Sequence, residues 1–241
     1  FRLRPFSSNK NAEAPIILLQ KKYSNAAKVP KVHFWTSVDQ STYYSIAVVD
    51  QNSPTRSTEL EINAFDHSLT NIRTQTFTLP IKEDQFKLIS VFEDSKDAVW
   101  IIYSTPDTTR KTEKRVTYGM FKFLPNNPVQ VQVPLDFQGN MLTSFKYTID
   151  KNDHIHFVGV FEKDEPKATK NTSLVYLKLD PDGKPVSYAQ KKFTAKEMDI
   201  LGDENMYVGK DGDIGLSPQV LMKSLFVFED GSVKLLMEYN S

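Results

Sequence analysis

Two histidines on one predicted strand are the first residues in the chain that could do chemistry. His154 and His156 lie at positions i and i+2, which places both side chains on one face of a strand, as a two-ligand metal site requires. The pattern supplies no third ligand in register, and His33 and His67 have no recognisable partners. We therefore expect the pair to line a packed interface or a central channel and to make ordinary hydrogen bonds.

Acidic residues recur at short polar turns, which is a second place where chemistry could occur. Asp39, Asp94, Asp150 and Asp230 each lie in a polar turn between two apolar runs, and such side chains close on the local backbone. We expect turn formers here rather than ligands. The segment "KDGDIG" (210–215) has part of a calcium-loop pattern but lacks its full spacing and its distant Glu, so a solvated turn is predicted.

The two tryptophans and two polar segments complete the candidates. Trp35 and Trp100 could stack on sugar rings if exposed, but their strands are so apolar that burial is predicted. The basic "TTRKTEKR" (108–115) has no interleaved aromatics and indicates a solvated connection. The segment "EKDEPKATKNTS" (162–173) is a second polar connection, and its Asn171-Thr-Ser matches a glycosylation acceptor.

Motifs for the common catalytic mechanisms are absent from the sequence. It contains no Gly-rich phosphate loop, no G-x-S-x-G and no H-E-x-x-H. We therefore assign no catalytic, cofactor-binding or metal-binding residue and expect no cofactor; the ligand-binding residues are unknown. Glycosidase carboxylates have no short signature, so an enzyme stays open while a non-enzyme is favoured.

Composition narrows the class of protein. The chain has 241 residues, 30 basic and 30 acidic side chains, no Cys and 12% aromatic residues, which indicates a β-rich globular fold without a net field for nucleic acid. No segment reaches the apolar length of a membrane helix, the longest candidate being "APIILL" (14–19). Phe1 is not an initiator Met, which suggests a processed product or a piece of a longer chain.

A repeated phrase indicates the architecture. An apolar run, an acidic turn and a second apolar run recur four times, as in "KLISVFEDSKDAVWIIYS" (87–104) and "SLFVFEDGSVKLLMEY" (224–239), and the first three copies are followed by two more strand-like runs. This predicts four-stranded antiparallel meanders. Their second strands are mostly apolar at both even and odd positions, and their fourth strands alternate with polar residues, a gradient that favours a β-propeller over a β-sandwich.

With the phrases "LKLDPDGKPV" and "FEDGSVKLL", the chain resembles four-stranded propeller-repeat proteins of the secreted or cell-surface bacterial type. The expected fold class is all-β, a β-propeller with about four readable blades, possibly part of a larger ring. We expect 1–241 to be a single propeller domain or part of one. The units are expected at about 31–80, 86–135, 142–194 and 224–241, with an insertion at 195–223. The insertion could be a functional loop or a degenerate blade.

The last unit ends after its second strand. Either "APIILLQKKY" (14–23) supplies a strand that closes the ring, or residues beyond Ser241 are missing from this sequence, and we favour the second explanation.

The favoured function is a non-enzymatic binding or scaffold module that presents loops to a protein or glycan partner. A periplasmic, cell-surface or secreted location is expected, and the oligomeric state is unknown. One alternative is a carbohydrate-active hydrolase using acidic residues, although the predicted first strands carry no acid before their turns. Another is a purely structural domain of a larger surface protein.

Overall fold

The chain folds as two compact units. The computed structural model describes residues 2–3, 16–17, 32–37, 40–48, 55–106, 116–124, 130–137, 141–162, 171–194, 196–197, 206–208, 214–216 and 220–239. One unit comprises 1–109 and 118–132, and the other comprises 110–117 and 133–241. Among the described residues, no helix is long and apolar enough to cross a bilayer.

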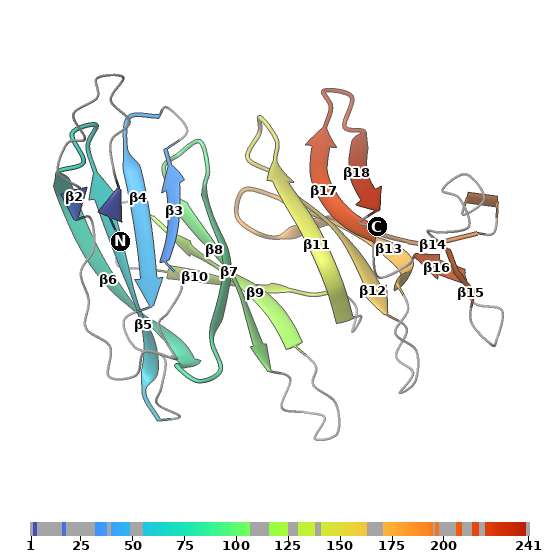
Figure 1. The fold of residues 1–241 in the computed structure, drawn as a ribbon, viewed down its shortest axis with the longest axis horizontal. Helices are drawn as coiled ribbons and strands as arrows, with labels where there is room; N and C mark the ends of the chain where they lie inside the picture. The colour runs from blue at the N-terminus through green and yellow to red at the C-terminus, as the bar shows by residue number, and fades with distance from the viewer. Residues whose placement is uncertain are drawn as a thin grey trace. The chain divides into compact units, whose positions relative to one another are not determined.

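Two four-stranded antiparallel sheets follow one another in the first part of the chain (Figure 1). The first sheet consists of β3 (Val32–Thr36), β4 (Tyr43–Val48), β5 (Ser57–Phe65) and β6 (Asn71–Lys82), paired in that order. The second consists of β7 (Lys87–Glu93), β8 (Val99–Pro106), β9 (Val116–Phe123) and β10 (Gln130–Leu135). A separate two-stranded sheet joins β1 (Arg2–Leu3) to β2 (Ile16–Ile17).

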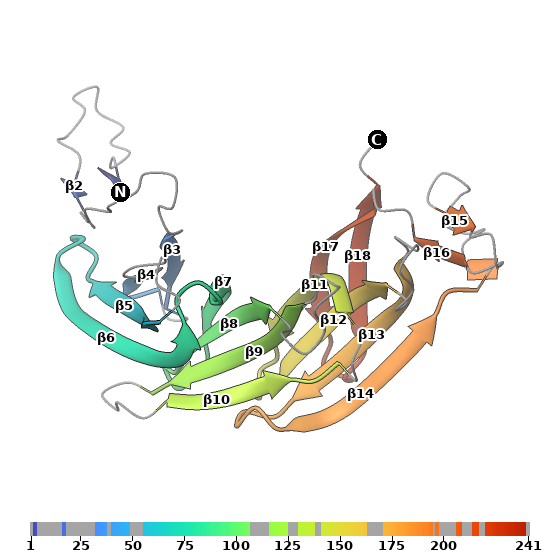
Figure 2. The ribbon, with the colours of Figure 1, turned by 90° about the horizontal axis from the view of Figure 1, so that it is seen from below.

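The third sheet repeats the meander and is extended at one end. It contains β11 (Met141–Ile149), β12 (Ile155–Glu162), β13 (Asn171–Leu179) and β14 (Pro185–Lys192), and β14 forms its outer edge (Figure 2). The short strands β15 (Met206–Val208) and β16 (Ile214–Leu216) join it through the pair Asn171 and Leu216. The last element is a hairpin of β17 (Val220–Val227) and β18 (Val233–Tyr239).

Burial is greatest on the second strand in the second and third sheets. The side chains of β8 from Val99 to Ser104 are all buried, as are those of β12 from Ile155 to Val160. The outer strand β14 is exposed at every position except the half-buried Tyr188. The predicted fold class, all-β and built from four-stranded meanders of the propeller-blade type, is confirmed, as is the burial gradient. The expectations of a single domain and of its unit boundaries stay predictions.

One core joins the sheets of the first unit. Ile46 and Leu60 of the first sheet and Ile101 and Phe121 of the second are each at most 1% exposed and belong to a single apolar cluster. At about 25 cal/mol per Å² of apolar surface, burying such side chains is the main favourable term in folding. The alternating pattern of the strands therefore determines which face of each sheet is packed.

Five of the described hairpin turns share one hydrogen-bonded geometry. In the turn that starts at Asp94, the Asp94 N–H donates to the carbonyl of Ala98 at 3.0 Å and the Asp97 N–H donates back to the carbonyl of Asp94 at 3.2 Å. Asp97 has φ 60°, the left-handed conformation of a three-residue hairpin loop with a bulge. Turns that begin at Asp66, Asp150, Asp180 and Phe228 make the same pair of backbone hydrogen bonds.

The aspartate that begins a turn also caps it. The Oδ1 atom of Asp94 accepts hydrogen bonds from the N–H groups of Lys96 and Ala98, both at 3.0 Å. Asp66, Asp150 and Asp180 accept the equivalent pair of backbone N–H groups. The expectation that these acids are turn formers is therefore confirmed at Asp94 and Asp150.

One of the four predicted equivalent positions, Asp230, differs from the prediction, and a second is not tested. Asp39 lies outside the described residues. In the last hairpin the turn begins at Phe228, and Asp230 lies two residues later, where it accepts a hydrogen bond from the Ser232 N–H at 2.8 Å. Sequence alignment on the acid was therefore wrong by two residues there, because the position of the left-handed Gly231 sets where the turn starts.

Asp94 also contacts side chains outside its turn. It is 3% exposed, and its Oδ2 accepts a hydrogen bond from Trp100 Nε1 at 3.0 Å and lies 3.3 Å from Lys122 Nζ. The Lys122 ammonium also lies 4.8 Å from the centroid of the Trp100 ring. One carboxylate thus links the turn to the second and third strands of its sheet.

Replacing Asp94 with alanine should destabilise the protein by about 3 kcal/mol, because Lys122 would be left buried without its carboxylate. The matched control is Asp66→Ala, which removes the same two turn hydrogen bonds and should cost about 1 kcal/mol. Urea unfolding of both variants measures the difference, and equal losses would contradict a special role for Asp94.

Candidate acid–base site

The turn of the third sheet holds the predicted histidine pair. Asp150 Oδ1 caps the turn by accepting the N–H groups of Asn152 at 2.8 Å and His154 at 3.0 Å. Its Oδ2 lies 3.0 Å from Nε2 of His156, whose side chain is 1% exposed, and 3.2 Å from Nδ1 of His154. The two histidines are thus held by a shared carboxylate.

A tyrosine extends this group to a third strand. Nδ1 of His156, on β12, lies 2.8 Å from the hydroxyl oxygen of Tyr176, on β13. An ionised Asp150 can accept hydrogen bonds but cannot donate them. Nε2 of His156 therefore carries a proton and donates the hydrogen bond to Asp150. In the neutral imidazole, Nδ1 is then the acceptor for the Tyr176 O–H. The three side chains form one directional chain, Tyr176 to His156 to Asp150.

The surroundings shift the pKa values of Asp150 and Tyr176, which end this hydrogen-bonded chain, in opposite directions. Partial burial acts to raise the pKa of Asp150, but hydrogen bonds from His156 and from the N–H groups of Asn152 and His154 outweigh it and lower the pKa to about 2. Burial raises the pKa of Tyr176, and the Asp150 carboxylate adds to this effect. Asp150 is therefore an anion and Tyr176 a neutral phenol at neutral pH.

Tyr176 is one of the residues that line a cavity of about 300 Å³ in the second unit. Apolar side chains form most of its wall, among them Val158 and Leu174 from the third sheet and Val233 and Leu235 from β18. Lys191 also lines the cavity and is already paired with the carboxylate of Glu197. A cavity of this size is at the lower end for small-molecule sites.

The second sheet has an equivalent group with different chemistry. Trp100 and His156 occupy the same place, since each pairs with the second residue before its turn aspartate, Phe92 and Thr148 respectively. Both donate to the Oδ2 atom of that aspartate at 3.0 Å. The carboxylate therefore has a structural role in both sheets, and the third sheet adds a titratable phenol beside a cavity.

The other sequence candidates have simpler positions. Trp100 is 1% exposed as predicted, and Trp35 is partly buried and stacked on Tyr44 with ring centroids 5.0 Å apart. His67 packs edge-on against Tyr43. His33 lies half-buried in β3. Residues 107–115, 163–170 and 209–213, which include the basic segment, most of the polar connector and most of "KDGDIG", lie outside the described residues.

One acid was misplaced by the sequence interpretation. The first strands were expected to carry no acid before their turns, but Glu93 is the last residue of β7 and is 7% exposed. Burial and the neighbouring Glu93 carboxylate raise the pKa of Tyr44. The first strand of the second sheet therefore does carry an acid, contrary to the expectation.

Sequence reasoning found His156 and Asp150 but not Tyr176 or the association of the three. The available signal was the hairpin register, which brings the sixth residue after the turn aspartate back beside its carboxylate. In the part of the chain that the structure describes, no group of three or more His, Cys, Asp or Glu could hold a metal ion.

No protein-family model and no curated protein matches the sequence. Solved structures with a similar fold include cobalt-substituted Synechocystis ACO, with 11% identity over 88% of this chain and 50% of that one and a TM-score of 0.44. A Glu150Asp mutant of Synechocystis apocarotenoid oxygenase is 12% identical over 97% of this chain and 55% of that one, with a TM-score of 0.46. An ACO/RPE65 chimera is 11% identical over 88% of this chain and 50% of that one, with a TM-score of 0.44. The chain spans about half the length of these solved chains.

This comparison corrects the favoured expectation of a non-enzymatic binding or scaffold module, because the similar solved chains are oxygenases by name. The strand pairing itself shows the all-β fold of four-stranded meanders, and the secreted repeat type has no support. At this level of identity and TM-score the likeness does not carry the oxygenase activity to this chain. The expected location and the protein or glycan partner stay predictions.

The Asp150 carboxylate should make stability depend on acid pH. Its folded pKa of about 2 lies below the ordinary value of 3.8, so its contribution of roughly 2 kcal/mol is complete above about pH 5 and is lost as the pH falls through 2. Urea unfolding between pH 6 and pH 2 should show this loss in the wild type and a shallower one in Asp150→Asn. Parallel pH profiles for the two proteins would contradict the assignment.

Proposed function

We propose that this chain is part of an enzyme whose reaction includes proton transfer at the Tyr176 hydroxyl. The observation that carries the proposal is the hydrogen-bonded chain Tyr176–His156–Asp150, which begins at a residue on the wall of an apolar cavity. Nucleophile, base and orienting carboxylate in hydrogen-bond reach of one another are the recurring parts of acid–base and nucleophilic sites.

Each residue has a distinct part in the proposed step. When the Tyr176 oxygen attacks or activates a bound group, its proton passes to Nδ1 of His156, and the resulting imidazolium is stabilised by Asp150. In the reverse direction His156 returns the proton and Tyr176 acts as a general acid. Asp150 stays ionised throughout and sets the tautomer of His156, because its pKa of about 2 is far below neutral pH.

The cavity supports a small and mainly apolar substrate. Its mainly apolar walls lie beside the half-buried Tyr176, and a hydrogen bond between phenol and substrate is stronger in apolar surroundings than in water. The base itself is sheltered, since His156 is 1% exposed. A substrate would therefore meet Tyr176 and not the histidine.

An aryl sulfonyl fluoride tests the proposal without knowledge of the substrate. The Tyr176 oxygen forms a bond to sulfur, fluoride leaves, and the phenol proton passes to His156. We expect Tyr176 to be labelled at least about tenfold faster than Tyr188, which is also half-buried but donates its hydrogen bond to the Phe137 carbonyl at 3.4 Å. Peptide mass spectrometry of the labelled protein gives both rates.

Two variants separate base assistance from simple access. His156→Gln and Asp150→Asn should each slow labelling of Tyr176 by about tenfold or more, whereas Tyr188→Phe should leave it unchanged. Circular dichroism at the labelling temperature verifies that each variant is folded. Equal labelling of Tyr176 and Tyr188, or no effect of His156→Gln in a folded protein, would rule out the proposed proton transfer.

A further inference from the structure

The β17–β18 hairpin is packed on one face. Met222 is 6% exposed and forms a small core with Val160 of the third sheet, against which Leu235 and Met237 of β18 also pack. β17 is in contact with β11, and the two lie side by side in Figures 1 and 2. The hairpin thus covers the face of the third sheet that carries Val158 and Val160.

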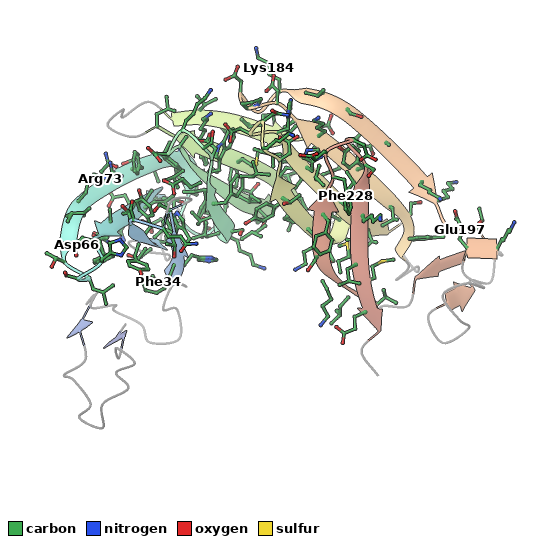
Figure 3. The ribbon with its side chains drawn as sticks, turned by 90° about the horizontal axis from the view of Figure 1, so that it is seen from above. Phe34, Asp66, Arg73, Lys184, Glu197 and Phe228 are labelled. Atoms are coloured by element: carbon green, nitrogen blue, oxygen red, sulfur yellow. The ribbon has the colours of Figure 1, made fainter. Side chains whose placement is uncertain are left out.

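The opposite face of the hairpin carries large apolar side chains in solvent. Leu221, Phe226 and Leu236 are 42%, 50% and 53% exposed, and Phe228, labelled in Figure 3, is 43% exposed at the turn. Lys234 and Glu238 share this face, opposite Phe226 and Leu221. Several large apolar side chains exposed on one face of a hairpin indicate an interaction surface.

The earlier sheets show what normally covers this face. Lys234 pairs with Phe226 across the hairpin as His156 pairs with Thr148 and Trp100 with Phe92. Counting two residues on, Leu236 is therefore equivalent to Val158 and Ile102. Those residues are 7% and 0% exposed, against 53% for Leu236.

In the third sheet, the position equivalent to Leu236 is Val158, and the β17–β18 hairpin covers the face on which Val158 lies. Val158 lies on the face of the third sheet that β17 and β18 cover, so the sheet that follows in sequence buries this row. By the same geometry, the row of Leu236 fits the apolar face of one further sheet.

The hydrogen bonding of β18 also indicates that a further strand can pair with it. In each of the first three sheets the second strand pairs with a third. Among the strands that the structure describes, β18 is hydrogen-bonded to β17 alone. An open edge beside an exposed apolar face is a site for strand addition.

We propose that the edge of β18 receives two further strands, and that the face of Leu221, Phe226 and Leu236 packs against another four-stranded meander. Both are supplied by polypeptide of the same protein outside residues 1–241. The occupant is a meander because the second sheet shares one core with the first and the hairpin covers the third, and the register of the hairpin repeats that of the earlier sheets.

The test compares the 241-residue chain with the intact protein purified from its natural source. Hydrogen–deuterium exchange should show the β18 amides that point away from β17 exchanging at least about 100-fold more slowly in the intact protein. Leu236→Asp should lower the unfolding midpoint of the intact protein by about 10 °C and leave that of the 241-residue chain nearly unchanged. Val186→Asp on the outer strand β14, 56% exposed, is the matched control and should be neutral in both.

Several results would overturn this inference. A natural protein of 27.6 kDa would leave no polypeptide to supply the strands. Equal exchange of the β18 amides in the two proteins, or a neutral Leu236→Asp in an intact protein, would show that the edge and face stay open. Protection of β18 in the 241-residue chain through dimerisation would assign the surface to a second copy.

Discussion

The structure depends on one interaction, the acceptance of two backbone N–H groups by the aspartate that begins a hairpin turn. At Asp94 and Asp150 the second oxygen also binds a side chain from the following strand. The carboxylate thereby fixes both the turn and the register of the first two strands, and a one-residue slip would move every apolar side chain to the other face. The buried rows of β8 and β12 exist because this register is set at the turn.

The same interaction explains how a structural position can become a chemical one. The partner of the carboxylate is an indole at Trp100 and an imidazole at His156, and both satisfy the same oxygen at the same distance. An indole can only donate, so the chain of hydrogen bonds ends there. An imidazole has a second nitrogen, which reaches the Tyr176 hydroxyl on the next strand. A change at one position of a repeat thus converts a link between strands into a path for a proton.

Most of the fold could be predicted from the sequence, because the apolar and polar patterns of strands and the polar residues of turns are local signals. Second strands buried on both faces and alternating fourth strands were predicted and found. The errors were at positions decided by register rather than composition. Asp230 looked equivalent to Asp94 although Phe228 begins that turn, and Glu93 looked like a turn residue although it ends β7. Tyr176 could not be linked to His156 because the two meet across strands that are joined by a long connection.

The cavity and the open edge of β18 are physically coupled. Val233 and Leu235 line the cavity from β18, which among the described strands is hydrogen-bonded to β17 alone and packs through one apolar face. A strand that is hydrogen-bonded along one edge can shift further than a strand that is hydrogen-bonded along both edges. Each additional hydrogen bond between strands removes backbone freedom. The distance from that wall to Tyr176 therefore depends on what pairs with β18. Completion of the sheet would narrow the range of cavity shapes, and with it the range of molecules that can be held against the phenol.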